Sequence, residues 1–101
     1  MTAGNIKEEY LQLINSFLED KIGANEFSLK YLHKMKSDNR TFGDDLYDIL
    51  QKMFDEANSY TDNPEIYYSN PDFYLTDSEL KIRAKEIFNK LKKLLNTGAK
   101  S

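Results

Sequence analysis

The sequence predicts an all-α protein, an antiparallel four-helix bundle with a long loop between its third and fourth helices. Four segments carry apolar side chains at helical spacing, and the first two connections are short enough to make neighbouring helices antiparallel. Residues 66–68 and 73–75 are too short, and too close to proline, to form strands. A chain of 101 residues can build one core, so we expect a single domain over residues 1–101.

The first two predicted helices are separated by Gly23. The first runs from Asn5 to Ile22, with Glu8 in capping position, and its apolar stripe consists of Ile6, Tyr10, Leu13, Ile14, Phe17 and Leu18. The second begins near Asn25 and ends in the polar run 37–40. Its inner face carries Phe27, Tyr31, Leu32 and Met35.

The third predicted helix follows Thr41 and continues to about Tyr60. Its apolar face consists of Leu46, Ile49, Leu50, Met53 and Ala57. On the opposite side, Asp44, Asp48 and Asp55 fall within about 40° of one another at 100° per residue. At 1.5 Å per residue, these three carboxylates form a line about 16 Å long. One helix thus has an apolar face and an acidic face.

The segment from residue 60 to residue 76 is expected to be a long loop. It contains both prolines, Pro64 and Pro71, and each follows an asparagine, which favours turns over helix. Most connections in compact domains have about 4 to 6 residues, and longer ones are often functional. We expect Ile66 and Phe73 to fold back onto the bundle as a lid.

The last predicted helix begins at Thr76. Glu79 follows three residues later, which is the spacing of a capping box, and Gly98 is expected to end the helix. Its apolar stripe consists of Leu80, Ala84, Ile87, Phe88, Leu91, Leu94 and Leu95.

Charge is distributed very unevenly along the chain. Residues 41–79 contain ten acidic side chains and a single lysine, a net charge of −9, whereas residues 80–101 carry +6 and residues 1–40 are neutral. Such asymmetry indicates the charge of a partner better than the overall value of −3 does. Tyrosines lie within the same acidic stretch, and a merely solvated surface does not need aromatic rings.

The acidic, tyrosine-rich surface is therefore predicted to bind a basic partner. Asp44 and Asp48 are like charges four residues apart on a helix, which is unfavourable unless a cation lies nearby. The candidate partner-binding residues are Asp44, Asp45, Asp48, Asp55, Glu56, Tyr60, Asp62, Glu65, Tyr67, Tyr68, Asp72 and Tyr74.

Residues typical of catalysis or cofactor binding are scarce. The chain has no cysteine, its four glycines form no phosphate-binding loop, and its one histidine, His33, has no metal-binding companion at the usual spacing. We therefore expect no enzyme activity, no cofactor and no metal. No apolar run approaches a membrane span, and the first residues lack the apolar region of a signal peptide, so we expect a cytosolic protein.

Two other functions fit parts of the pattern. An acidic helical adaptor or regulator of some other basic protein would need the same acidic face. Nucleic-acid binding would use Lys81, Lys85 and Lys92 on the last helix, but the sequence pI of 5.1 and the lack of neighbouring aromatic residues favour a structural role for them.

Two segments resemble a known family. Residues 17–27, FLEDKIGANEF, resemble the FL-x-x-KI-x-A-x-EF turn between the first two helices of colicin D immunity proteins and related immunity proteins of bacterial toxin systems. Residues 80–91, LKIRAKEIFNKL, are similar to that family's last helix, and residues 56–68 share its helix end followed by an acidic, proline-bearing loop. The sequence departs from the family in its longer, tyrosine-rich stretch 60–75.

The resemblance implies a small, acidic, four-helix protein that binds the basic nuclease domain of a bacteriocin or contact-delivered toxin, as a monomer in a 1:1 complex. In the colicin D type the toxin cuts the anticodon loop of tRNA, and the immunity protein presents acid where RNA phosphates would lie. The acidic surface agrees with this, since a tRNA-binding cleft is basic. No direct contact with nucleic acid or membrane is implied.

Overall fold

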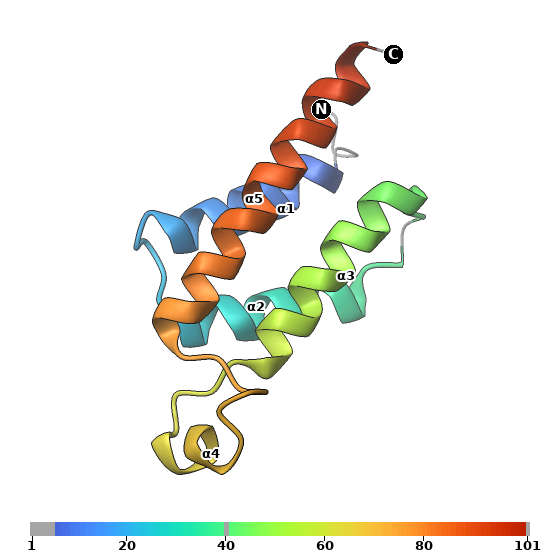
Figure 1. Ribbon diagram of the computed structural model, residues 1–101. Helices are drawn as coiled ribbons and strands as arrows, with labels where there is room; N and C mark the ends of the chain where they lie inside the picture. The colour runs from blue at the N-terminus through green and yellow to red at the C-terminus, as the bar shows by residue number, and fades with distance from the viewer. Residues whose placement is uncertain (1–5, 40, 101) are drawn as a thin grey trace.

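The computed structural model describes residues 6–39 and 41–100, with side chains described up to residue 94. These residues form four long helices and one short one, so the all-α class is confirmed for the described part of the chain (Figure 1). In chain order the helices are α1 (Ile6–Leu18), α2 (Ala24–Ser37), α3 (Asp44–Ser59), α4 (Pro64–Ser69) and α5 (Asp77–Lys100).

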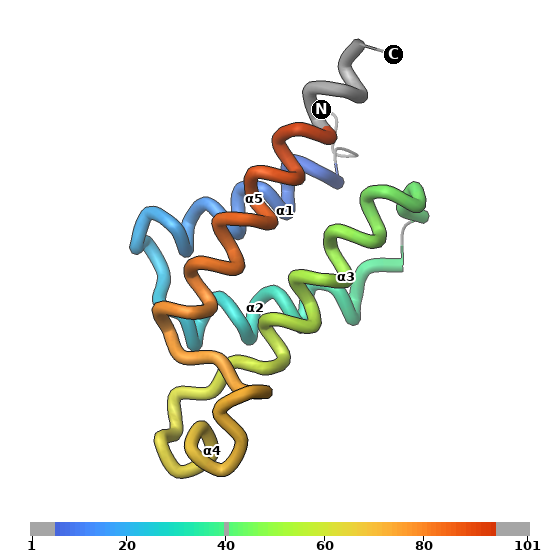
Figure 2. Tube along the Cα trace, in the orientation of Figure 1, coloured from blue at the N-terminus to red at the C-terminus, as the bar shows by residue number. Residues whose placement is uncertain are grey.

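The four long helices enclose one apolar core. α3 and α5 lie side by side and run in opposite directions, while α1 contacts α5 and crosses it obliquely, and α2 packs against α3 (Figure 1). The short helix α4 lies apart from them, beyond the C-terminal end of α3 (Figure 2). The buried core consists of Tyr10, Ile14, Phe17, Ala24, Phe27, Tyr31, Leu46, Leu50, Met53, Ala57, Leu75, Leu80, Ala84, Ile87 and Leu91.

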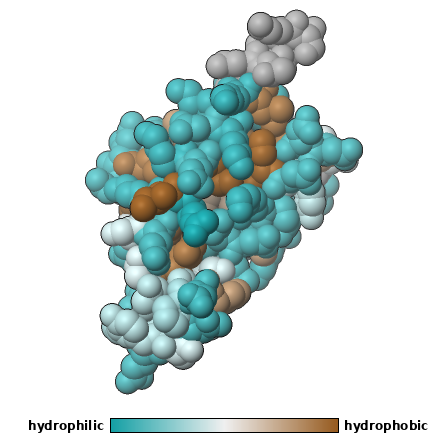
Figure 3. All heavy atoms as spheres, in the orientation of Figure 1, coloured by the Kyte–Doolittle hydropathy of each residue, from teal (hydrophilic) through white to brown (hydrophobic). Residues whose placement is uncertain are grey.

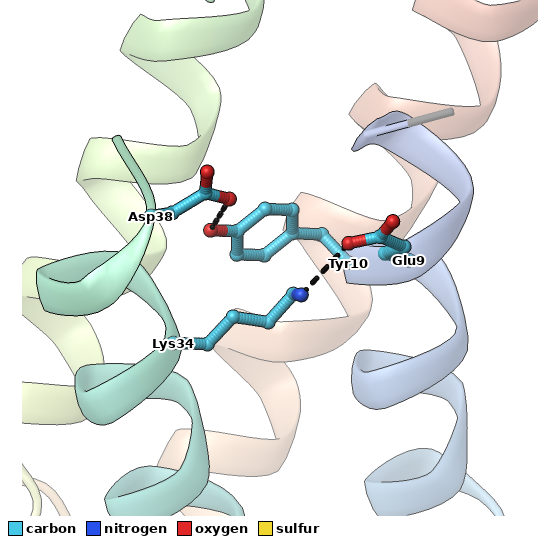
Figure 4. A network of polar contacts seen from close by, with 4 residues as sticks. All are labelled: Glu9, Tyr10, Lys34 and Asp38. Atoms are coloured by element: carbon cyan, nitrogen blue, oxygen red, sulfur yellow. Dashed lines mark hydrogen bonds and ion pairs between the residues drawn. The ribbon is translucent and has the colours of Figure 1, made fainter. Parts of the chain in front are cut away.

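Two fully buried tyrosines connect the helices through their hydroxyl groups. The Tyr31 hydroxyl donates to the Leu50 carbonyl at 2.9 Å and so joins α2 to α3. The Tyr10 hydroxyl donates to Asp38 Oδ2 at 3.0 Å, while Lys34 lies 4.9 Å from the centre of the Tyr10 ring and contacts Glu9 at 2.9 Å (Figure 4). This network fastens α1 to the end of α2, because buried polar groups are stable only when they are hydrogen-bonded.

α1 is shorter than predicted, ending at Leu18 instead of Ile22. The chain turns at Asp20, whose φ of 62° lies in the left-handed region, and the N–H of Lys21 donates back to Ser16 at 2.9 Å. Gly23 is then the N-cap residue of α2. The predicted cap at Asn5 lies outside the described residues.

The segment predicted as a long loop contains the helix α4. Pro64 stands in its first turn, where proline is tolerated because no helical partner is needed for its nitrogen, and the Asn63 side chain accepts from the N–H of Glu65 at 2.9 Å. The expectation that Asn-Pro favours turns over helix was therefore wrong at Pro64. Asparagine is a favoured N-cap residue, and proline is favoured at N1, the next position. An Asn-Pro pair can therefore also begin a helix.

Residues 61–74 form an excursion from the bundle. It is closed at its base by a short neck, in which Ser59, Tyr60 and Thr61 meet Leu75. The N–H of Leu75 donates to the Ser59 carbonyl at 2.9 Å, and the N–H of Thr61 donates to the Leu75 carbonyl at 3.1 Å, which makes an isolated parallel bridge between Tyr60 and Leu75. Leu75 is buried in the core. We call residues 61–74 the α4 excursion.

The predicted lid on the bundle is wrong. Ile66 and Phe73 are 42% and 51% exposed, and it is Leu75 and Tyr60 that pack against the core. The neck explains the difference, since its two backbone hydrogen bonds bring the core contact to the base of the excursion and leave its tip outside.

The start of α5 follows the predicted capping box. The backbone N–H of Thr76 donates to Glu79 Oε1 at 3.0 Å, and the N–H of Glu79 approaches Thr76 Oγ1 at 3.3 Å. The predicted end of this helix at Gly98 is wrong, since α5 continues to Lys100.

Candidate toxin-binding surface

The outer side of α3 carries a line of exposed carboxylates. Leu46, Leu50 and the rest of the apolar face are buried against the neighbouring helices, which turns the opposite side outward. Asp44, Asp48 and Asp55 are all exposed on that side. We call these three residues the acidic ridge.

The acidic ridge has no cation partner within the described part of the chain. Glu9 and Glu26, on the first two helices, contact Lys34 and Lys30, each at 2.9 Å. No lysine or arginine among residues 6–39 and 41–94 makes an ion pair with a ridge carboxylate, and Asp55 accepts only a hydrogen bond from Gln51 Nε2 at 3.1 Å. Like charges in one row without a counter-ion oppose the folded state slightly and favour a basic partner.

Glu56 and Asp45 flank the ridge and differ from each other. The Glu56 side chain is only 14% exposed and lies between Lys52 at 3.3 Å and Arg83 at 3.8 Å. The contact between Glu56 and Arg83 joins α3 to α5. The negative charge of Glu56 is therefore already balanced by basic side chains of the chain itself. Asp45 is exposed and lines a shallow hollow together with Lys7.

The α4 excursion carries the other predicted residues of the surface. Asp62, Glu65 and Asp72 are exposed, and Tyr68 is 74% exposed. Tyr67 is half-buried and meets the Tyr68 ring edge to face at 5.2 Å between ring centres. Exposed rings of this kind are the residues that become buried anchors when a partner binds.

Tyr74 and Tyr60 are less available than the prediction assumed. Tyr74 is half-buried and packs edge to face on Phe73, 4.9 Å between ring centres. Tyr60 stands in the neck and packs against the core. Partial burial, followed by the interaction of its hydroxyl with the Asp77 carboxylate and the nearby charge of Asp62, raises the pKa of Tyr60.

The ridge and the α4 excursion are adjacent but separate parts of one surface. Asp55 lies one turn before the end of α3, next to the neck, whereas Asp44 lies at the opposite end of that helix. Figure 3 shows strongly hydrophilic atoms over α3 and a paler patch of intermediate hydropathy over the α4 end.

Two further residues belong to this surface and were not predicted. Tyr47 on α3 is 48% exposed, next to the ridge, and lines a hollow shared with Phe42 and Phe54. Its position three residues after Asp44 could have shown that a ring flanks the acid row. Asp77, the first residue of α5, lines a groove with Asp62, and only the folded chain brings these two carboxylates together.

Other kinds of site find no support in the residues that are described. His33 is exposed, as expected, and its carbonyl accepts a hydrogen bond from the Ser37 hydroxyl at 2.8 Å. No group of three or more His, Cys, Asp or Glu side chains among the described residues could hold a metal ion. Within the same part of the chain, no helix combines the length and apolarity needed to cross a membrane.

Comparison with known protein families assigns the chain to one of them. Residues 5–91 match the family described as bacterial self-protective colicin-like immunity. The chain is a member of this colicin-like immunity family. The match includes both segments whose resemblance the sequence suggested, residues 17–27 and 80–91. Comparisons with curated proteins and with solved structures found no match.

Membership of the colicin-like immunity family gives the chain a general role. Proteins of this family protect the producing bacterium from its own toxin, so the chain is a toxin-neutralising immunity protein with a cognate toxin as its protein partner. Inhibitors of this kind generally act by binding and not by catalysis.

Proposed function

We propose that this immunity protein neutralises a toxin nuclease that cuts tRNA, by covering the basic RNA-binding cleft of the nuclease with the acidic ridge and the α4 excursion. The observation that carries the proposal is the ridge itself: three exposed carboxylates in a row, without an ion-pair partner in the described chain. A cleft that binds RNA is lined by lysine and arginine, which supply the missing counter-charges.

The geometry of α3 suits this form of substrate mimicry. Asp44, Asp48 and Asp55 are separated by about 6 and 10 Å along the helix axis at 1.5 Å per residue, so they can meet several basic side chains at once. A helix holds the carboxylates in fixed positions, and little conformational entropy is lost when they bind.

The tyrosines of the α4 excursion would act after the first encounter. Opposite charges steer two proteins together and mainly set the association rate, whereas buried aromatic contacts mainly set the dissociation rate. We assign the first role to the ridge and the second to Tyr67 and Tyr68, of which Tyr68 is the more exposed. Because tRNA is cytosolic, we place the 1:1 complex of monomers in the cytosol.

The proposal is tested first with the toxin itself. The chain is co-expressed with the C-terminal domain of the toxin encoded beside it, and the purified complex is assayed for tRNA cleavage against the free toxin domain. We expect copurification and complete loss of cleavage. Copurification without loss of cleavage, or no RNA cleavage by the free toxin domain, would show that the nuclease mechanism is wrong.

The role of the ridge is tested by reversing its charges. The triple variant Asp44→Lys, Asp48→Lys and Asp55→Lys should associate with the toxin at least tenfold more slowly at low salt, and its rate should depend less on salt concentration. These residues are exposed, so helix content should be unchanged in circular dichroism.

A matched control separates the ridge from the total charge. Glu8, Glu19 and Glu26 are exposed on α1, α2 and the turn between them, and their replacement by lysine changes the net charge by the same amount. We expect this control to associate several times faster than the ridge variant. Equal rates for the two triple variants would mean that the ridge has no special part.

A further inference from the structure

The base of the α4 excursion forms a groove against the start of α5. The groove has a volume of about 420 Å³ and includes Asp62, Tyr67 and Tyr68 on one side and Thr76, Asp77 and Ser78 on the other. Its lining contains two carboxylates, two tyrosines and three hydroxyl side chains, but no lysine, arginine or histidine. The lining therefore has the chemistry of a cation site, and none of the lining residues supplies a cation.

The two carboxylates lie close enough to act on the same neighbour. After partial burial, the charges of both Asp77 and Asp62 contribute to raising the pKa of Tyr60 in the neck. No ion pair joins Asp62 or Asp77 to a cation in residues 6–39 and 41–94. A cation placed in the groove would therefore meet two carboxylates that no ion pair within these residues neutralises.

The walls of the groove are fixed before any partner arrives. On one wall Asn63 caps α4 through Glu65, and its own N–H donates to Thr61 Oγ1 at 3.1 Å. On the other wall Thr76 and Glu79 form the capping box of α5. The two caps already use the N–H groups of Glu65 and Glu79, and the two carboxylates of the lining repel an anion.

From the lining we infer that this groove receives an arginine side chain of the toxin. A guanidinium is planar and offers several N–H donors, so it can donate to carboxylates while its face stacks on an aromatic ring. Tyr67 and Tyr68 meet edge to face, with 5.2 Å between ring centres, and both rings line the groove together with the two carboxylates. A lysine ammonium would also pair with the carboxylates, but it is not planar and would stack less well on a tyrosine ring.

This inference deepens the proposed function and rests on it for the identity of the partner, but the groove can be tested without the toxin. The probe is Nα-acetyl-arginine methylamide, titrated to millimolar concentrations while the backbone amides are followed by NMR. We expect shifts at Asp62, Tyr67, Tyr68 and Asp77. The citrulline counterpart has nearly the same shape without the charge, and it should cause no such shifts.

Variants connect the shifts to the groove. Asp62→Asn with Asp77→Asn, and separately Tyr68→Leu, should each weaken binding of the arginine probe, whereas Glu86→Gln, at an exposed acid outside both the lining and the candidate surface, should not. In the toxin complex the double variant should bind at least tenfold more weakly, through faster dissociation. Circular dichroism checks that each variant keeps its helices.

Three outcomes would overturn the arginine assignment: equal shifts with citrulline, binding of the lysine counterpart as tight as that of arginine, or shifts unaffected by the double variant. None of them bears on the toxin itself. The proposed function fails on separate evidence. It is wrong if the chain does not copurify with the toxin domain, or if the ridge variant associates at the same rate as its control.

Discussion

At the scale of single residues, Tyr10 shows how a polar group specifies the core. Its ring is fully buried, and its hydroxyl donates to Asp38 (Figure 4). Replacing Tyr10 by phenylalanine keeps the ring and removes the donor, which should lower the free energy of unfolding by about 1 kcal/mol. Urea denaturation followed by circular dichroism measures this change.

The control for Tyr10→Phe is Tyr47→Phe on the exposed side of α3. Its effect should stay within about 0.5 kcal/mol, because Tyr47 is 48% exposed. If Tyr10→Phe proves as stable as the parent chain, the hydrogen bond to Asp38 contributes nothing to the fold.

Two tyrosines predict how stability changes in alkaline solution. Burial raises the pKa of Tyr31, and burial together with the carboxylate of Asp77 raises that of Tyr60. Since their pKa values in the folded state lie above the value of about 10 in an unfolded chain, the stabilisation is complete below about pH 10 and is lost as the pH rises further. We expect the fully buried Tyr31 to ionise only as the helices melt.

Parallel measurements of tyrosinate absorbance and of helical circular dichroism test this expectation. The exposed Tyr68 should contribute to an early phase of absorbance change during which helix content is constant. Ionisation of all seven tyrosines with the helices intact would contradict the burial of Tyr31.

At the scale of the elements, the neck determines which part of the long connection supports the core. Leu75 is buried, whereas Ile66 on α4 is 42% exposed. Leu75→Ala should therefore lower the free energy of unfolding by about 2 to 4 kcal/mol, the usual cost of removing a buried leucine side chain. Ile66→Ala should change it by less than about 0.5 kcal/mol. Thermal and urea unfolding of the two variants compare these effects directly.

The comparison of Leu75→Ala with Ile66→Ala also decides between the observed arrangement and the lid that the sequence suggested. A larger loss of stability from Ile66→Ala would mean that α4 folds onto the bundle in solution. The opposite order supports an excursion fastened only at its base.

The long helices were predictable from sequence because their apolar periodicity persists over several turns. The face of α3 from Leu46 to Ala57 and the capping box at Thr76 both appear where they were expected. The excursion was not predictable in the same way. Its six-residue helix is too short for a periodic signal, and burial of Leu75 depends on two backbone hydrogen bonds between distant residues.

The candidate surface was predictable to a similar extent. Exposure of the ridge follows from the helix wheel, because an aspartate opposite Leu50 must face outward. Pairing of Glu56 with Arg83 and the approach of Asp77 to Asp62 join residues from different elements, and no local pattern contains that information.

At the scale of the whole molecule, the acidic residues and the basic α5 carry opposite charges on neighbouring parts of the surface. Lys85 and Lys90 on α5 are exposed. If the partner is basic, these lysines oppose its approach, so Lys85→Glu with Lys90→Glu should raise the association rate roughly severalfold at low salt. Stopped-flow mixing with the toxin domain at several salt concentrations measures the effect.

The lysine variant also tests nucleic-acid binding through α5. Retention of the parent chain on immobilised RNA at low salt, abolished in the variant, would favour that alternative. We expect no retention of either protein, together with faster binding of the variant to the toxin.

The two hydrogen bonds at the neck have a consequence for how such a protein can change its target. They join Ser59, Thr61 and Leu75, so the ends of the excursion are held together whatever lies between them. Insertions, deletions or a transplanted segment within residues 62–74 would leave the packing of the four long helices untouched. The sequence of the excursion can therefore be replaced in one recombination event, without a prior change to the core.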